Sequence, residues 1–412
     1  MLLCATLWWS SSARLAMAFL RHGCSVSAVC PPGHPLRYIT GIETIYTYGS
    51  LASIHSLKTA IRTAQPSIIV PCDDGVVWQL HALHATEADL RPLIELSLGA
   101  SKAYPTIQKR GEVLHVAGEL GIRVPRTQLV NSLDDLEGWC QDAPAVLKID
   151  GTWGGEGVVI VRSPQEAIQG YYAARGTARA GVAWKRFLIN RRPVALWSWR
   201  RSKALKITIQ EFIPGVPATT MFACWRGEVL AHTTVEVLSA QGITGAATVV
   251  RPLENSAIED AARLLAYEFQ LSGFHGLDFI LEKGSGEAYM IELNPRSTQL
   301  GHLNLSSHGD LAGVIAARLR NEALCPVAPE DRILDSSIAF FPHAFKSNPK
   351  SAYLRQGYHD VPWEEPALVR ELMRDSWPDR QWLSRVYHSF RLRRQLDSRQ
   401  EIFQPANSNS QT

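Results

Sequence analysis

The chain has 412 residues, of which 46% are hydrophobic and 20% are charged, and its formal net charge is +3. This length exceeds one typical hydrophobic core and predicts about two or three domains, while the composition is ordinary for a soluble globular protein. The net charge is too small to argue for nucleic-acid binding by itself. Seven cysteines without a C-x-x-C pair favour reduced thiols in the cytoplasm over a disulfide scaffold or a zinc site. No run of about eighteen apolar residues occurs, so no membrane-spanning helix is expected.

The N-terminal part alternates between short apolar runs and helical patterns, which predicts an open α/β unit. Its expected elements are a strand over residues 2–6, a helix over 10–22, a strand over 24–30, a helix over 51–64 and a strand over 67–71. Asp73 and Asp74 directly follow the last of these strands, where such a sheet binds its ligands. They either contact a substrate amine or hydroxyl or cap the next helix, and the cap is the favoured interpretation.

A glycine-rich loop connects two apolar strands in the middle of the chain. The strands are expected over residues 145–149 and 158–162, and the sequence between them is Asp-Gly-Thr-Trp-Gly-Gly-Glu-Gly. Glycines free the backbone to fold over a ligand with N–H groups pointing at phosphate oxygens, and Lys148 on the first strand can reach the same phosphates. No G-x-x-x-x-G-K-[ST] motif is present, which argues against a P-loop enzyme.

Two later apolar runs, separated by the polar, glycine-bearing residues 282–287, predict a β-hairpin. If the runs pair antiparallel, the carboxylates of Asp278 and Glu292 face one point, and Asn294 emerges on the same strand face as Glu292. Two carboxylates and an amide oxygen suit Mg²⁺ that is bound together with phosphates. Arg296 follows after another two residues, where it can hold a phosphate or acyl-phosphate oxygen.

At these residues the chain resembles the ATP-grasp superfamily, whose members carry an acid on one strand and Glu-x-Asn, often within E-[IML]-N-P-R, on the next. The match lies at Asp278 and at residues 292–296, preceded in the expected order by Lys148 and its glycine-rich loop. The resemblance implies an α/β ATP-grasp fold with α+β lobes and an N-terminal open α/β domain. It also implies ATP with Mg²⁺ (or Mn²⁺), about two ions being usual in phosphoryl transfer.

The resemblance further implies a role for each matching position. Metal ligands would be Asp278, Glu292 and Asn294, and the catalytic residues would be Arg296, at the acyl phosphate, and Lys148. The ATP-binding residues would be Lys109, Lys148, Gly154, Gly155, Gly157, Glu211, Phe212 and Ile213. From the local sequence alone, Lys109 is equally well explained as a solvated lysine in a first helical turn, and no acid follows Ile213 soon enough to contact the ribose.

The chain is divided accordingly into four expected parts: an N-terminal α/β domain over residues 1–106, a small lobe over 107–210, a large lobe over 211–328 and a C-terminal extension over 329–412. The further elements expected there are a helix over 107–120, a strand over 207–213, a hairpin of strands 221–226 and 228–235, a strand over 244–250 and a helix over 256–271.

The implied reaction activates a carboxylate as an acyl phosphate, which an amine then attacks, with ADP as a product. The alternatives are a carboxylase-type or carbamoyl-phosphate-type enzyme that uses bicarbonate, and a non-catalytic ATP-binding regulator. D-alanine–D-alanine ligases are less similar, because they carry an arginine where this chain has Gly276, and the carboxylases share the Asn-Pro-Arg sequence more closely. The expected partners are small-molecule carboxylate and amine substrates and a second copy of the chain in a homodimer, with nucleic acid disfavoured.

Four remaining features lie outside this set of site residues. Residues 184–206 are basic and interleaved with tryptophan, which is compatible with nucleic acid, a membrane surface, an anionic substrate, a subunit contact or, as the favoured interpretation, a solvated face between lobes. His302 either lines the acceptor site or packs, and packing is favoured. Residues 335–365 are expected to return over the site, and the polar tail from about residue 385 to be loose.

Overall fold

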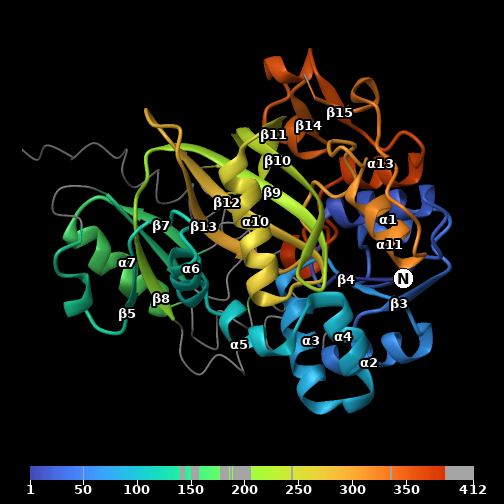
Figure 1. Ribbon diagram of the computed structural model, residues 1–412, viewed down its shortest axis with the longest axis horizontal. Helices are drawn as coiled ribbons and strands as arrows, with labels where there is room; N and C mark the ends of the chain where they lie inside the picture. Colours follow the sequence, from blue (N-terminus) through green and yellow to red (C-terminus); the bar gives the residue numbers. More distant parts are fainter. Residues whose placement is uncertain are drawn as a thin grey trace, which may run out of the picture.

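The computed structural model describes residues 1–49, 51–139, 144–149, 157–176, 185, 188, 206–242, 245–334 and 336–385. Within them the strands form three sheets, of four, seven and four strands. Figure 1 shows the N-terminal sheet beside the large central sheet, with the third sheet on the other side of the central one. None of the described helices has the length and apolarity needed to cross a bilayer.

The N-terminal sheet is parallel, with the strand order β3-β2-β1-β4. Its elements are β1 (Leu2–Cys4), α1 (Ser10–Arg21), β2 (Ser27–Cys30), β3 (Thr44–Thr47), α2 (Ser53–Ala64), β4 (Ile69–Pro71), α3 (Asp74–Thr86) and α4 (Arg91–Leu98). Successive residues enter different cores, since Leu2 packs with α2 and α3 whereas Leu3 packs with α1. Burial on both faces explains why the central strands are continuous apolar runs. Strand β3 was not predicted, because it lies at the sheet edge and has only two half-buried residues between exposed threonines at its ends.

The small-lobe sheet is antiparallel, with the strand order β5-β8-β6-β7. It comprises β5 (Thr127–Val130), β6 (Ala145–Ile149), β7 (Val158–Val161), α7 (Pro164–Gly176) and β8 (Ile207–Glu211). Leu147 and Ile209 pack against Tyr171 of α7 in the core of this lobe. The strands predicted over residues 145–149, 158–162 and 207–213 are present as β6, β7 and β8. The predicted helix over 107–120 is wrong in its bounds: α5 (Tyr104–Ile107) and α6 (Arg110–Glu119) are separate, because Lys109 between them has an extended backbone.

The large sheet has seven strands in the order β13-β12-β9-β10-β11-β14-β15. Its strands are β9 (Gly215–Trp225), β10 (Glu228–Ala240), β11 (Ala247–Pro252), β12 (Gly273–Glu282), β13 (Ala288–Asn294), β14 (Ile338–Phe340) and β15 (Tyr358–Asp360). The predicted turn between β9 and β10 is present, and both of its residues, Arg226 and Gly227, have positive φ, as a two-residue hairpin turn of type I′ requires. Strand β11 lies further along the chain than predicted. Strands β14 and β15 extend this sheet, although their residues were expected in a C-terminal extension. The predicted boundary between the large lobe and this extension at residue 328 stays a proposal.

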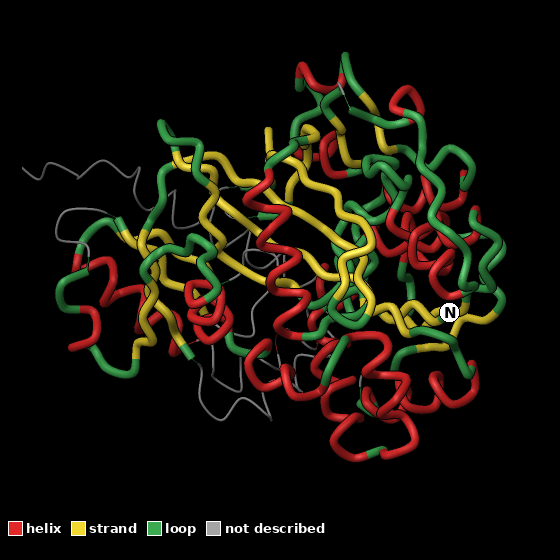
Figure 2. Tube along the Cα trace, viewed as in Figure 1, coloured by secondary structure: helices red, strands yellow, loops and turns green. Residues whose placement is uncertain are grey.

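Helices cover both faces of the large sheet. α10 (Ser256–Phe269) lies across one face of the sheet, as the tube in Figure 2 shows. On this face Leu265 packs with Phe222 and Phe279. α11 (Leu311–Leu319) and α1 lie on the other face, where Ile315 packs with Met221. The remaining helices are α12 (His343–Ser347) and α13 (Pro366–Met373). Since α1 belongs to the N-terminal sheet, one core joins that sheet to the large one.

Candidate functional site: a carboxylate pair at the edge of the large sheet

The predicted hairpin is present, and its two acids stand directly opposite each other. β12 and β13 pair antiparallel, with Asp278 beside Glu292 in the register. Asn294 lies on the same face and donates a hydrogen bond from Nδ2 to Oδ2 of Asp278, with 2.9 Å between the two atoms. Asp278 and Asn294 come from neighbouring strands, so their side chains converge at one point of the sheet edge.

A β-bulge in β13 determines which face Glu292 occupies. Asp278 pairs with Glu292, but the next residue, Phe279, pairs with Met290, so Ile291 is an extra residue on β13. Phe279 and Met290 are buried against α10. Without the extra residue, strict alternation would place Glu292 on the same face as Met290. The bulge instead directs Glu292 to the face of Asp278, which is a use of bulges common beside active sites.

The two carboxylates differ in their electrostatic surroundings. Burial raises the pKa of Asp278, and the facing Glu292 carboxylate raises it further. Burial also acts to raise the pKa of Glu292, but the positive charges of Arg110 and Lys148 outweigh it, and this pKa lies below its ordinary value. The pair is thus an acidic centre whose negative charges repel each other, which favours binding of a cation between them.

Three basic side chains from different parts of the chain surround this centre. Arg110, in the first turn of α6, places Nη2 at 2.6 Å from Oε1 of Glu292. Lys148 of β6 is 5% exposed, and its Nζ lies 3.3 Å from the main-chain oxygen of Ile291. Arg296, just past β13, donates from Nη2 to Oδ1 of Asn294 over 3.1 Å. Phosphate groups bound beside the carboxylates would therefore meet cations from both lobes.

The antiparallel hairpin thus carries a carboxylate pair with an adjacent amide, and a lysine from a second antiparallel sheet faces it. A comparison of the sequence with protein families agrees with this arrangement. Residues 194–299 match the family model of the ATP-grasp domain. This match assigns residues 194–299 to the ATP-grasp domain family. ATP and Mg²⁺ are the standard cofactors of this family.

Solved structures of ATP-grasp enzymes share the fold over most of the chain. N5-carboxyaminoimidazole synthetase from Staphylococcus aureus, in complex with ADP, has a TM-score of 0.56 at 12% identity, over 79% of this chain and 78% of its own. The biotin carboxylase domain of Hydrogenobacter thermophilus 2-oxoglutarate carboxylase, with MgADP and bicarbonate, has a TM-score of 0.57 at 14% identity, over 82% and 73%. L-amino acid ligase from Bacillus licheniformis has a TM-score of 0.57 at 14% identity, over 82% and 78%. No curated protein matches the chain.

Lys109, for which the ATP-grasp resemblance implied a phosphate contact, does not contact the carboxylate pair. Its Nζ lies 2.5 Å from Oε1 of Glu112 on the exposed side of α6. The neighbouring Arg110 contacts Glu292 instead, a role that the sequence analysis missed. The sequence did contain a signal for this contact. Arg110 precedes the buried Val113 and Leu114 by three and four residues, so it lies on the inward face of α6.

The predicted adenine-binding segment connects two lobes of the ATP-grasp fold. Glu211 ends β8, Ile213 is buried, and residues 212–214 lead to β9 in the large sheet. The exposed Glu211 carboxylate accepts a hydrogen bond from the Arg126 N–H. Gly157 has a φ of +78°, and its carbonyl accepts from Ile149 N, which closes the base of the β6–β7 connection. The nucleotide contacts of this segment stay predictions.

Several predicted features lie outside the described residues. These are Gly154, Gly155, the tail from residue 386 and all of the basic segment 184–206 except Lys185, Leu188 and Lys206.

Arg296 and the two aspartates after β4 are parts of one arrangement. Asp73 caps α3, as favoured from sequence, by accepting from Val76 N, and its other oxygen accepts from Thr6 N. Asp74 accepts from Nε of Arg296 over 2.9 Å, a contact that the sequence analysis did not anticipate.

His302 is buried, as the favoured packing interpretation predicts, and it belongs to a charged cluster. Its Nε2 lies 2.8 Å from Oδ2 of Asp360, and the other oxygen of Asp360 lies 2.5 Å from Nη2 of Arg14. The cluster thus joins β15, the segment after the β12–β13 hairpin and α1. Among the described residues up to 385, Asp360 contacts this segment rather than the carboxylate pair.

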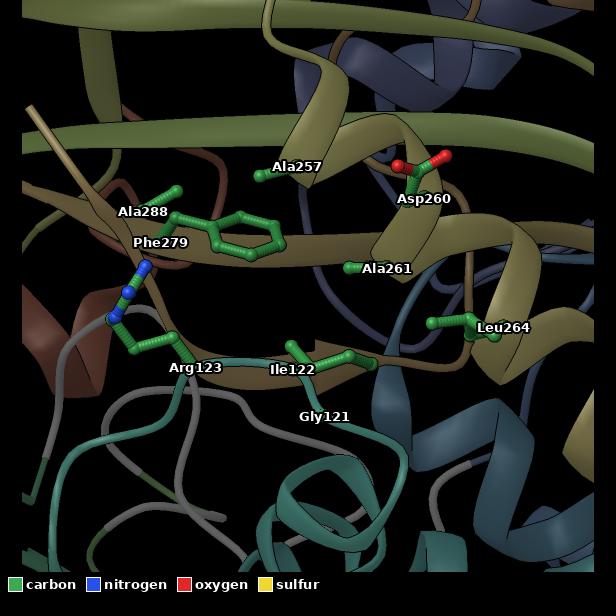
Figure 3. Close-up of a pocket in the computed structure, with 9 residues that line it drawn as sticks. All are labelled: Gly121, Ile122, Arg123, Ala257, Asp260, Ala261, Leu264, Phe279 and Ala288. Carbon is green, nitrogen blue, oxygen red and sulfur yellow. The ribbon is translucent and has the colours of Figure 1, made fainter.

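One groove lies on the opposite face of the hairpin. It is lined by residues 121–123, the outer side of α10, Phe279 and Ala288, as Figure 3 shows. Phe279 follows Asp278 directly, so their side chains leave β12 on opposite faces. The chemistry of the carboxylate pair, rather than the size of a groove, therefore locates the candidate site.

Proposed function

We propose that the protein is an ATP- and Mg²⁺-dependent, ADP-forming ligase that activates a carboxylate as an acyl phosphate for attack by an amine. The observation that carries this proposal is the register of Asp278 opposite Glu292, with Lys148 of the small lobe in contact with the same strand. A nucleotide held between the small lobe and this hairpin would place its phosphates beside both carboxylates and cations.

The donor set fits Mg²⁺, because Asp278, Glu292 and Asn294 supply hard oxygen ligands from two paired strands. The raised pKa of Asp278, caused by burial and by Glu292, is relieved when a cation lies between the two carboxylates. Among the described residues no three His, Cys, Asp or Glu side chains form a metal-ligand cluster, so phosphate oxygens and waters must complete the coordination. Asn294 now points Nδ2 at Asp278, and it must turn its amide over to offer Oδ1 to the ion.

The proposed reaction needs positioning and charge neutralisation more than acid–base catalysis. A substrate carboxylate oxygen attacks the γ-phosphorus, and the bond from that phosphorus to the ADP oxygen breaks. The amine then attacks the acyl carbon, and inorganic phosphate leaves. Mg²⁺ held by Asp278, Glu292 and Asn294 would supply neutralisation of the phosphate charge. Arg110 and Lys148 would hold phosphate oxygens, and Arg296 would hold the acyl phosphate.

The structurally similar proteins support this class of reaction. An L-amino acid ligase, a carboxyaminoimidazole synthetase and a biotin carboxylase domain share the fold, and the last two were crystallised with ADP or MgADP. At 12% to 14% identity they leave the substrates open.

The test is release of phosphate from MgATP in the presence of pooled carboxylates, pooled amines, both pools, or bicarbonate. We expect turnover only with both pools together. Bicarbonate-dependent turnover would replace the proposal with a carboxylase-type activity, and tight MgATP binding without turnover in any arm would indicate a regulator. Glu292→Gln should abolish turnover, whereas Glu287→Gln, on the same hairpin but paired with Arg123, should retain it.

A further inference from the structure

The guanidinium of Arg296 is held by three acceptors from two parts of the molecule. Nε lies 2.9 Å from Oδ2 of Asp74, Nη2 lies 3.1 Å from Oδ1 of Asn294, and Nη1 lies 3.3 Å from the main-chain oxygen of Ser297. The side chains of Arg296 and Asp74 are only 19% and 20% exposed. An arginine carries five N–H donors in one plane, so these three contacts fix the plane and leave one N–H on each terminal nitrogen.

Asp74 itself has a rigid support. It is the first residue of α3, directly after Asp73, whose carboxylate accepts from the main-chain N–H groups of Thr6 and Leu7 as well as from Val76. The segment that carries Arg296 is tied to the same place, because both N and Oγ of Ser297 donate to the main-chain oxygen of Pro71 at the end of β4. The ion pair therefore connects two backbones that are already docked.

We propose that Asp74 is a positioning residue for Arg296. By holding Nε, Asp74 orients the guanidinium so that its two remaining terminal N–H donors point toward a phosphoryl or carboxylate anion beside the proposed metal ligands. This inference rests on the proposed function. Asp74 binds the Nε side of the guanidinium, so an anion can bind the terminal nitrogens in a bidentate manner without displacing it. When Asn294 turns its amide toward a cation, Nη2 of Arg296 loses an acceptor, and the incoming anion supplies the replacement.

Whether neutralising Asp74 weakens or strengthens anion binding distinguishes a positioning role from a simple charge effect. Asp74 is a negative group next to an anion site, so a charge effect alone predicts that neutralising it strengthens anion binding. Positioning predicts the opposite, because an arginine without its Nε partner samples many rotamers and must be ordered by the anion itself. A purely structural ion pair predicts lower thermal stability with unchanged anion affinity.

The experiment is a calorimetric titration of inorganic phosphate into the complex of the full-length protein with MgADP. We expect Asp74→Asn to weaken phosphate binding by about tenfold, with MgADP affinity unchanged, and Asp74→Glu to recover part of the loss. The matched control is Asp89→Asn, which removes an exposed acid that pairs with Arg62 in the same domain, and it should leave both affinities unchanged. If Asp74→Asn does not fold, weaker phosphate binding by Asp74→Glu than by the wild type supports the inference.

Equal or tighter phosphate binding by the folded Asp74 variants would overturn the inference and leave the proposed function intact. A wild-type protein that does not bind MgADP would overturn both. Thermal unfolding of each variant shows whether any loss of phosphate affinity merely follows a loss of stability.

Discussion

Arg110 Nη2 lies 2.6 Å from Glu292 Oε1, although 182 residues separate the two along the chain. This ion pair docks the first turn of α6 on β13, and it is partly buried, with exposures of 11% and 30% for the two side chains. Its charge, with that of Lys148, keeps the pKa of Glu292 below its ordinary value in spite of burial. The pair therefore favours the ionised form of Glu292, which the proposed role of this residue as a metal ligand requires.

The first prediction separates Arg110 from its neighbour. Arg110→Met should raise the KM for MgATP by at least about tenfold, because a phosphate contact and the partner of Glu292 are both lost. Lys109→Met should change it less than about twofold, because within the described part of the chain Lys109 pairs with the exposed acid Glu112. Steady-state kinetics with the substrates found in the pooled screen measure both values. A strong effect of Lys109 with a weak one of Arg110 would instead support Lys109 as the phosphate contact.

The second prediction concerns the repulsion between the paired carboxylates. Asp278→Asn removes one of two facing negative charges and retains an acceptor for Asn294, so without metal it should raise the melting temperature by about 1 to 3 °C. The same variant should lose the further rise that MgATP gives the wild type. Thermal unfolding with and without MgATP tests both statements, and Glu287→Gln is the control. A variant that is less stable without metal, and still stabilised by MgATP, would contradict this view of the pair.

The third prediction concerns the buried cluster of Arg14, Asp360 and His302. Burial acts to raise the pKa of Asp360, but His302 and Arg14 lower it more, so the folded pKa lies below the ordinary value of 3.8. A carboxyl group whose pKa is lowered by folding stabilises the folded state at pH values above its ordinary pKa. This contribution disappears as the pH falls through the pKa of the folded state. Asp360→Asn should thus cost about 3 kcal/mol near neutral pH and progressively less below pH about 4. Urea unfolding across this range measures the cost, and one that does not shrink in acid would refute the assignment.

Local pattern was sufficient to predict the hairpin and much of the sheet content. The polar, glycine-bearing residues 282–287 between two apolar runs predicted the antiparallel pairing of Asp278 with Glu292. The N-terminal strands β1, β2 and β4 were recognisable because they are buried apolar runs, unlike β3 at the sheet edge. In each case the signal lies within a few neighbouring residues, where the periodicity of the element is directly visible.

The remaining features depend on contacts that sequence spacing does not reveal. Tyr289, Met290 and Ile291 are an unbroken run of apolar or aromatic residues, so nothing in it marks Ile291 as the bulge. Asp74 and Arg296 are 222 residues apart, and their ion pair exists because β4 and the end of β13 meet. A strand was expected within residues 335–345, and β14 lies there, but its place beside β11 and the addition of β15 follow from pairing that the pattern does not specify.

The most direct test of the central claim is the binding of ATP to the wild type and to Glu292→Gln, each measured by calorimetry with excess Mg²⁺ and with a chelator. We predict that Mg²⁺ strengthens ATP binding by the wild type at least about tenfold and that the variant, with an unchanged circular dichroism spectrum, loses this dependence. A variant that binds ATP as tightly as the wild type, with the same response to Mg²⁺, would show that the paired carboxylates of β12 and β13 do not hold the metal.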